Sequence, residues 1–223
     1  MLTRGTNFDA TTLIATASVA VLAISVALNR AAYGILLLAA AVAAIAFSRD
    51  TSFSRPWAIA GLLYAALPAA ALMWLRNDEA FGAAAIIYLF AVAWTTDTAS
   101  YAAGRLIGGP KLAPDISPQK TWSGFIAGIL APLLVGYITA TVLESGSALR
   151  LALVSVGLAV ACQFGDSLES WVKRRFGAKD SSQLIPGHGG LLDRIDGLMM
   201  AAVLAGLIAL RDPATPGRGL LFW

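Results

Sequence analysis

Apolar residues fill long, nearly uninterrupted runs of this chain, and polar residues gather between the runs. In lipid, a helix satisfies its own backbone hydrogen bonds, and about 20 mostly apolar residues are enough to span a bilayer. The pattern therefore predicts an all-α, polytopic integral membrane protein with about seven transmembrane helices. We expect these helices near residues 11–28, 31–47, 57–75, 80–95, 124–143, 148–165 and 195–210.

The composition agrees with a membrane protein and narrows the possible functions. The 223 residues are 58% hydrophobic and 13% charged, whereas an average soluble domain has about 25% charged residues. The net charge of +3 comes without a dense basic run, so we expect no nucleic-acid partner. A single cysteine, Cys162, excludes an intrachain disulfide and a cysteine-based metal site. No repeat or linker divides residues 1–223, which we expect to form one domain.

The distribution of Lys and Arg predicts how the helices are oriented. An odd number of helices puts the N-terminus and the loops at 48–56, 96–123 and 166–194 on one side. That side holds eleven of the 16 Lys and Arg residues, so the positive-inside rule assigns it to the cytoplasm. We expect the first helix to be retained, because the segment before it lacks the features of a signal peptide. The compact, Ala-rich chain favours a bacterial inner membrane.

The segment from Asp166 to Asp196 concentrates the polar chemistry, with five basic residues, five acidic residues and the only histidine. If the sixth helix continues to about residue 176, Asp166, Ser170 and Lys173 share one helical face, and Arg174 lies beside them. A helix end at the following glycine would fit this extension. The alternative is an i,i+4 ion pair between Glu169 and Lys173, with basic side chains reaching to the interface.

A glycine turn follows this helix and leads to a pair of carboxylates. The turn reads Pro-Gly-His-Gly-Gly, and glycines let the backbone approach a ligand and present N–H groups to phosphate oxygens. Asp193 and Asp196 come three residues apart at the start of the seventh helix, where carboxylates also favour the helix dipole. Mg²⁺ binds through one or two carboxylates plus substrate phosphates. Carboxylates, cations and a glycine turn together therefore indicate phosphate chemistry.

The order of these residues resembles a known family. Ser170-x-Val-Lys-Arg, four residues, Lys179-Asp180, and then Leu-x-x-Gly-His-Gly-Gly-x-x-Asp-Arg-x-Asp, ending at Asp196, is similar to the hallmark motif of phosphatidate cytidylyltransferases. The upstream Gln163-x-Gly-Asp also fits. The resemblance covers roughly the C-terminal 130 residues, and many members are longer. We therefore expect this chain to lack one or two of their N-terminal helices.

The resemblance implies roles for the individual residues of this segment. Asp166 and Asp193 are expected as Mg²⁺ ligands, with Asp196 near them, and the family also implies a second, monovalent cation such as K⁺. The expected catalytic and phosphate-holding residues are Lys173, Arg174, Lys179, Asp180, Arg194 and Asp196. Ser170 and the turn residues His188, Gly189 and Gly190 are expected to bind substrate.

A second polar region, from Asp97 to Gly124, supports the same family. Its spacing places Asp97, Tyr101, Gly104 and Gly108 on one helical face, followed by Ser-Pro-Gln-Lys-Thr-Trp-Ser-Gly. The resemblance assigns substrate binding to Asp97, Tyr101, Arg105, Lys120, Thr121 and Trp122. Two positions depart from the family pattern, since Gln119 usually appears as Lys and Ser123 as Glu. Thr121 is also a plausible cap of the next helix.

The implied reaction joins CTP to phosphatidate and gives CDP-diacylglycerol and pyrophosphate, at the cytoplasmic side of the membrane. Membrane lipid is then a partner, and the family implies a homodimer. The alternatives are a CTP-dependent lipid kinase of the polyprenol or phytol type and a cytidylyltransferase for an ether-linked lipid. A CDP-alcohol phosphotransferase lacks support, because its Asp/Gly/Ala-Arg motif is absent. A membrane transporter would carry its charges near the midplane of broken helices, whereas here they cluster in the predicted loops.

Overall fold

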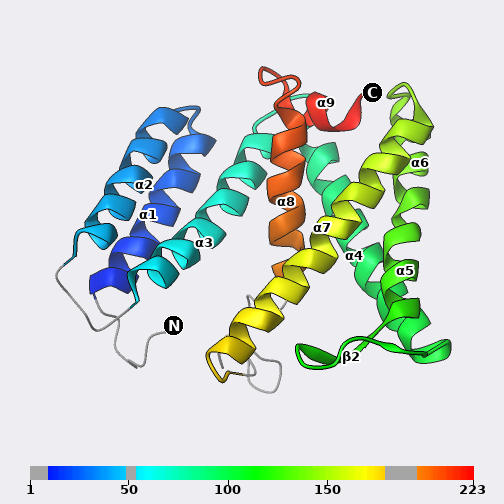
Figure 1. Ribbon diagram of the computed structural model, residues 1–223. Helices are drawn as coiled ribbons and strands as arrows, with labels where there is room; N and C mark the ends of the chain where they lie inside the picture. Colours follow the sequence, from blue (N-terminus) through cyan, green and yellow to red (C-terminus); the bar gives the residue numbers. More distant parts are fainter. Residues whose placement is uncertain (1–9, 49–53, 179–194) are drawn as a thin grey trace.

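The computed structural model describes residues 10–48, 54–178 and 195–223, which form a mostly helical bundle (Figure 1). The helices lie side by side, and both short strands lie at one end of the bundle. The elements are α1 (Ala10–Ala27), α2 (Ala31–Ala46), α3 (Arg55–Arg76), α4 (Gly82–Leu106), β1 (Lys111–Ala113), β2 (Ser117–Thr121), α5 (Trp122–Leu130), α6 (Pro132–Leu143), α7 (Ala148–Arg175), α8 (Asp196–Ala209) and α9 (Pro216–Leu221).

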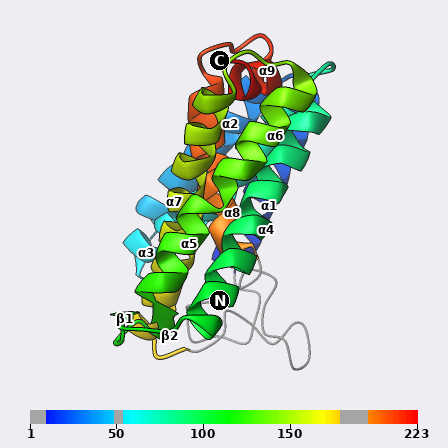
Figure 2. The same ribbon diagram turned by 90° about the vertical axis from the view of Figure 1, so that its right-hand side faces the viewer.

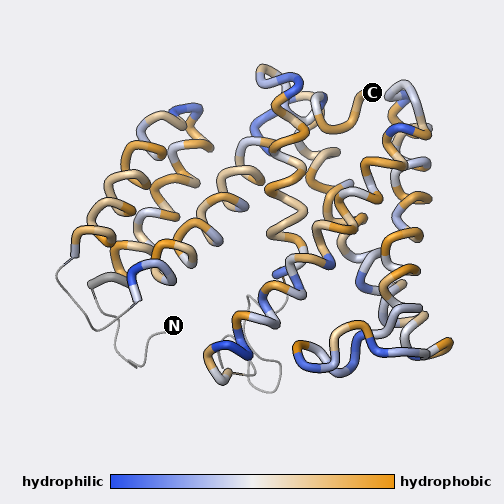
Figure 3. The backbone as a smooth tube through the Cα atoms, viewed as in Figure 1, coloured by the Kyte–Doolittle hydropathy of each residue, from blue (hydrophilic) through white to orange (hydrophobic). Residues whose placement is uncertain are grey.

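The mostly helical architecture predicted from the sequence is confirmed, whereas the predicted count of seven spans is not. Four helical stretches are long and apolar enough to cross a membrane: Arg55–Arg76, Gly82–Leu106, Trp122–Leu143 and Ala148–Arg175. Leu13–Ala27, Ala31–Ala46 and Asp196–Ala209 are also apolar but shorter. Figure 3 shows apolar residues along the helices and hydrophilic residues mainly at their ends.

Three features of the fold differ from the sequence prediction. Helix α4 continues to Leu106, about three turns beyond the expected end, because Asp97 and its polar neighbours interrupt the hydropathy of this segment but not its helix. The purely α-helical prediction also missed a two-stranded antiparallel sheet formed by β1 and β2. The short helix α9 was not predicted either.

The fifth predicted helix forms as two consecutive helices, α5 and α6. Ala131 connects them, and Pro132 opens α6 at a position where the missing N–H removes one intrahelical bond. The Ala131 N–H still donates to the Ala127 carbonyl at 2.9 Å. Figures 1 and 2 show α6 continuing beyond α5, so the two together run the length of the bundle.

Helix α3 joins two apolar cores. One core contains buried residues of α4, α7, α8 and α9, and the other contains buried residues of α1, α2 and α3. Trp74 of α3 packs against both cores. The hairpin formed by α1 and α2 therefore attaches to the rest of the bundle mainly through α3.

Glycines bring the helices around α7 into close contact. A Cβ added to Gly136 of α6 would lie 2.5 Å from the Leu151 carbonyl oxygen and 2.7 Å from the Ala152 Cα atom. At Gly165 of α7, the same addition would lie 2.7 Å from the Asp196 carbonyl oxygen of α8. Such small-residue contacts are the usual basis of helix packing in membranes, where lipid tails compete with apolar side chains.

Side-chain hydrogen bonds close the end of the bundle that lies opposite the strands. Buried Asp78 accepts from the Phe81 N–H at 2.9 Å and from the Arg218 N–H at 3.1 Å, so it ties the α3–α4 turn to α9. In the neighbouring loop, the hydroxyl of Thr215 and the guanidinium of Arg218 hold the pKa of Asp212 below its usual value. These contacts fix the far end of the bundle without involving the polar segment.

We expect Gly136→Ala to lower the free energy of unfolding by about 1–3 kcal/mol, because the new methyl group overpacks the α6–α7 contact. Gly157→Ala is the matched control on α7, since a Cβ there meets nothing within 4 Å. Removing a glycine from an uncrowded helical position should stabilise the protein by about 0.5–1 kcal/mol. Thermal unfolding of both variants in detergent measures the difference, and equal melting temperatures would contradict the packing argument.

Candidate active site

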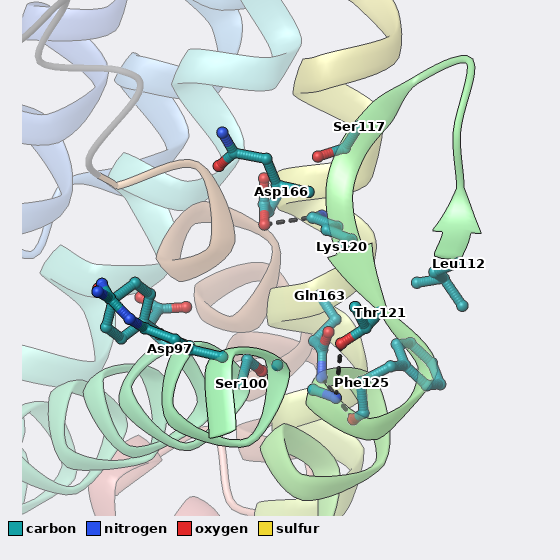
Figure 4. Close-up of a pocket in the computed structure, with 14 residues that line it drawn as sticks. Asp97, Ser100, Leu112, Ser117, Lys120, Thr121, Phe125, Gln163 and Asp166 are labelled. Atoms are coloured by element: carbon teal, nitrogen blue, oxygen red, sulfur yellow. Dashed lines mark hydrogen bonds and ion pairs between the residues drawn. The ribbon is translucent and has the colours of Figure 1, made fainter. Parts of the chain in front are cut away.

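A cavity of about 630 Å³ opens at the end of the bundle that carries the strands. Helices α4, α5 and α7 and strand β2 surround it, and Figure 4 shows their side chains converging on it. Six of its lining residues were predicted from sequence as site residues: Asp97, Tyr101, Arg105, Lys120, Thr121 and Asp166. The structure therefore brings the second polar region of the sequence together with the start of the Asp166–Asp196 segment.

An ion pair joins the hairpin to α7 inside this cavity. The Lys120 Nζ atom lies 2.7 Å from Asp166 Oδ2 (Figure 4). It also donates to Ser167 Oγ at 3.0 Å. The Lys120 and Asp166 side chains are 20% and 42% exposed, so solvent screens the pair and its contribution to stability is modest. Asp97 on α4 lies within electrostatic range of both groups. The cavity thus contains two carboxylates and one ammonium group from three separate elements.

Local backbone interactions position Lys120. The turn after α4 contains Gly108 at φ +66° and Gly109 at φ +106°, a conformation that glycine adopts without strain. Thr121 then caps α5, because its Oγ1 atom accepts from the Gly124 N–H at 3.2 Å. The capping role considered for Thr121 from the sequence is confirmed. Because Lys120 directly precedes this cap, its position follows from where α5 begins.

The two positions that depart from the family pattern both lie at this hairpin. Ser123 donates a hydrogen bond to the Gly108 carbonyl and so closes the turn between α4 and β1. Gln119 lines the cavity. The expected helical face of α4 holds for Asp97, Tyr101 and Gly104, whereas Gly108 lies beyond the end of the helix.

Sequence reasoning missed Ser100 and Phe125 of the cavity wall and the contacts that Gln163 makes there. Gln163 of α7 donates from Nε2 to the Phe125 carbonyl of α5 at 2.9 Å. A Cβ on Gly128 of α5 would collide with Ser100 Oγ and with Gln163 Nε2. The Gln163-x-Gly-Asp match pointed to Gln163, but nothing in the sequence identified Ser100 or Phe125 as neighbours. Within the described part of the chain, the buried Ser100 Oγ has no hydrogen-bond partner.

A sequence profile described as "Cytidylyltransferase family" matches residues 3–210. The chain belongs to the cytidylyltransferase family.

Curated relatives of this cytidylyltransferase-family chain carry the name phosphatidate cytidylyltransferase. The Brucella suis biovar 1 (strain 1330) protein is 51% identical over 150 residues, which cover 67% of this chain and 56% of the relative. The Rickettsia bellii (strain RML369-C) protein is 36% identical over 159 residues, or 68% of each chain. The Staphylococcus saprophyticus subsp. saprophyticus protein is 40% identical over 140 residues, or 62% and 54% of the two chains. The chain thus spans between half and about two thirds of the length of these relatives.

The family's hallmark segment begins on the last turns of α7. This helix ends at Arg175 and is followed by Gly177 at φ +66°, so the predicted extension and its glycine stop are confirmed. Lys173 Nζ lies 2.7 Å from Glu169 Oε2, which is the i,i+4 pair considered as the alternative. Ser170 and Lys173 are half-buried, and Arg174 is exposed at the helix end. Their predicted contacts with phosphate stay predictions.

A second group of carboxylates lies near Asp166. Glu169 is buried, and the Asp196 carboxyl group at the start of α8 lies within electrostatic range of it and of Asp166. Asp196 Oδ1 also accepts from the Gly197 N–H at 2.7 Å. Buried carboxylates repel one another unless a proton or a cation intervenes. The Lys173 ammonium group offsets part of this repulsion, and the negative charge that remains on Glu169, Asp196 and Asp166 favours a further cation near α7 and α8.

No three His, Cys, Asp or Glu residues in the described ranges meet closely enough to hold a metal ion by themselves. This finding is compatible with Mg²⁺, which commonly uses one or two carboxylates and completes its shell with phosphates and water. Seven predicted site residues lie outside the described residues: Lys179, Asp180, His188, Gly189, Gly190, Asp193 and Arg194. They connect α7 to α8, whose adjoining ends lie at the same end of the bundle as the cavity (Figure 1).

We expect Thr121→Ala to lower the free energy of unfolding by about 1 kcal/mol, because the first turn of α5 loses its side-chain cap. Thr121→Ser keeps the hydroxyl and should retain most of the stability. Thr141→Ala on α6 is a further control, since that exposed hydroxyl bonds only to carbonyls within its own helix. In detergent, the Thr121→Ala variant should have the lowest melting temperature of the three. Equal melting temperatures for Thr121→Ala and Thr141→Ala would contradict the capping role.

Proposed function

We propose that this protein transfers the cytidylyl group of CTP to phosphatidate and releases CDP-diacylglycerol and pyrophosphate. The observation that carries the proposal is the cavity at the polar end of a membrane-type helical bundle, where Asp166 and Lys120 meet. Membership of the cytidylyltransferase family and the names of the curated relatives support it. The matched regions cover only part of those relatives. The proposed activity therefore rests mainly on the cavity and its charged residues in this chain.

The location of the cavity suits one soluble substrate and one lipid substrate. CTP reaches the site from water, whereas phosphatidate keeps its acyl chains in the bilayer. Tyr101 lines the cavity and is 66% exposed, and Trp122, which does not line it but directly follows the lining residue Thr121, is 47% exposed. Aromatic side chains of this kind favour the interface between lipid and water. A site at this depth is open to both substrates.

The chemistry requires positioning and charge neutralisation rather than a strong base. A phosphate oxygen of phosphatidate attacks the α-phosphorus of CTP in line, and the bond from that phosphorus to the β-phosphate oxygen breaks. The nucleophile is already an anion, so no proton has to be removed from it. Lys120 and Arg105 line the cavity and supply positive charge for the phosphates. Lys173, Arg174, Lys179 and Arg194 are proposed to hold further phosphate oxygens.

Asp166 and Asp193 are proposed to hold Mg²⁺, with Asp196 nearby. The carboxylates described between α7 and α8 are the oxygen donors that this ion prefers. Bound there, the ion would offset the negative charge that builds up on the phosphates during transfer. The additional K⁺ ion and the homodimer rest on the family resemblance alone and stay predictions.

We further propose that α1, α2 and α8 cross the membrane together with the four longer spans. Their apolar sequences and their alignment beside the long helices support this count (Figure 1). With seven spans, the cavity and the Asp166–Asp196 segment share the side that carries most of the Lys and Arg residues. The positive-inside rule then places the active site on the cytoplasmic face of a bacterial inner membrane.

We expect Asp166→Asn to reduce CTP- and Mg²⁺-dependent formation of CDP-diacylglycerol by about two orders of magnitude or more, because a charged ligand becomes a neutral amide. Asp115→Asn is the matched control. That carboxylate is exposed in the turn between β1 and β2 and does not line the cavity. The assay follows CDP-lipid and pyrophosphate from purified protein. Substantial activity in Asp166→Asn would remove Asp166 from the metal-ligand role.

The same assay separates the proposed reaction from a lipid kinase. With CTP labelled at the α-phosphate, a cytidylyltransferase transfers the label to the lipid and releases unlabelled pyrophosphate. A kinase transfers only the γ-phosphate and leaves the label in CDP. Labelled CDP in place of labelled CDP-lipid would overturn the proposed function.

The sidedness gives an independent prediction. Cys162 is buried, with 2% of its surface exposed, so single cysteines can be introduced without replacing it. We expect Lys111→Cys in the hairpin to react with a membrane-impermeant maleimide only after the cells are opened. Arg218→Cys, at the opposite end of the bundle, should react in intact spheroplasts. The reverse labelling pattern would contradict a cytoplasmic site, and unmodified protein serves as the background control.

A further inference from the structure

Tyr64 of α3 carries a buried hydroxyl group with no hydrogen-bond partner in the part of the chain that the structure describes. A buried tyrosine hydroxyl normally finds a partner, because leaving a polar group unsatisfied costs free energy. Tyr88 shows the usual arrangement, since its hydroxyl lies 2.7 Å from Ser155 Oγ in the core of the bundle. The Tyr64 hydroxyl therefore calls for an explanation.

The face of α3 that carries Tyr64 turns toward the end of α7 and the start of α8. Trp57 lies seven residues before Tyr64, two helical turns away on the same face. The Trp57 ring packs 6.0 Å from the Trp171 ring and 5.0 Å from the Phe176 ring, both belonging to the last turns of α7 or its cap. Helix α3 also packs directly against α8. Tyr64 is thus held beside the polar segment by its own helix.

The neighbours of the Tyr64 hydroxyl are carboxylates. It lies within electrostatic range of Asp196, Glu169 and Asp166. The Glu169 Oε1 atom is likewise buried and without a hydrogen-bond partner in the described residues. A phenolic donor and a carboxylate acceptor in the same region thus both lack a hydrogen-bond partner among the described residues. A group that lies between them and accepts from the phenol would satisfy Tyr64.

We propose that Tyr64 is a substrate-positioning residue whose hydroxyl donates a hydrogen bond to a phosphate oxygen of the cation-bound nucleotide. The inference rests on the proposed function, in that it takes the ligand of this site to be a nucleotide with its Mg²⁺ ion. A phosphate oxygen accepts from the phenol, while the accompanying cation faces the carboxylates. Helix α3, which carries none of the polar motifs, then forms a further wall of the site.

The test compares Tyr64→Phe with Tyr88→Phe in the purified full-length protein. Each substitution removes one buried hydroxyl and keeps the aromatic ring. We expect Tyr64→Phe to raise the KM for CTP about tenfold, as for a lost hydrogen bond to a charged group, and to leave the melting temperature unchanged or higher. Tyr88→Phe should lower the melting temperature, because Ser155 loses a partner, and should leave the KM for CTP unchanged.

Binding is measured separately from turnover, as the rise in melting temperature caused by CTP with Mg²⁺ over that caused by Mg²⁺ alone. We expect this rise to be smaller in Tyr64→Phe than in the wild-type protein and unaltered in Tyr88→Phe. The proposal is overturned if Tyr64→Phe has the same KM for CTP as the wild-type protein and the same rise in melting temperature with CTP and Mg²⁺. A change in the stability of the variant does not affect this outcome.

The two measurements also separate this inference from the proposed function. If the wild-type protein is stabilised by CTP and Mg²⁺ but forms no CDP-lipid, the proposed reaction fails and the role of Tyr64 is still decided by the thermal measurement. If the wild-type protein is active and Tyr64→Phe behaves like it in both measurements, only the role of Tyr64 fails. A wild-type protein that is neither active nor stabilised overturns both.

Discussion

Close contacts at glycine residues set the distances between α7 and its neighbours, and the site depends on those distances. Apolar side chains gain little from leaving lipid for a helix interface, so association in a membrane relies on backbones that approach closely. Gly136 provides this contact from α6, Gly128 from α5, and Gly165 and Gly197 provide it between α7 and α8. The contacts of Gly128, Gly165 and Gly197 lie toward the polar end of the bundle, whereas Gly136 meets the first turns of α7 near the opposite end. The elements that carry Lys120, Asp166 and Asp196 therefore meet at fixed spacing.

Asp166 occupies the middle of the resulting arrangement. Asp166 lines the cavity together with Asp97 and Lys120, and it also lies within electrostatic range of the half-buried Asp196, which interacts with Glu169. Helix α7 contributes to both groups because Asp166 and Glu169 are three residues apart, a spacing that puts them close together on the helical surface. The Lys120 ammonium group can interact with negative phosphates, and the carboxylates can interact with a positive ion. Together they suit a ligand that combines the two.

The sequence predicted the parts of this structure that depend on local pattern. The apolar runs located the helices, the extension of α7 to Arg175 followed from residue spacing, and Thr121 was recognised as a possible cap. The hairpin was not predictable, because β1 has three residues and its pairing depends on where α4 and α5 lie. Hydropathy likewise ended α4 too early, since a polar helical face at the end of a span looks like a loop.

Contacts between distant segments were the other part that the sequence did not reveal. The pairing of Lys120 with Asp166 joins residues 46 positions apart, and no spacing rule connects them. Both had been singled out, but for separate roles and without the contact between them. Tyr64 was missed altogether, because a tyrosine within an apolar run of α3 looks like any other core residue. Its relation to the carboxylates exists only once α3, α7 and α8 are packed together.

The position of α3 between the two apolar cores has a consequence for how such a protein can change over evolution. Helices α1 and α2 pack mainly on one side of α3, away from the glycine contacts around α7. Helices added, exchanged or lost at that outer edge would leave the geometry around Asp166 untouched. Substitutions on the inner side of α3, by contrast, change the surroundings of the carboxylates directly. Variation in length among family members is therefore easiest to accommodate at the outer edge. Helix α3 itself is constrained, because its inner side contacts the elements that carry the carboxylates.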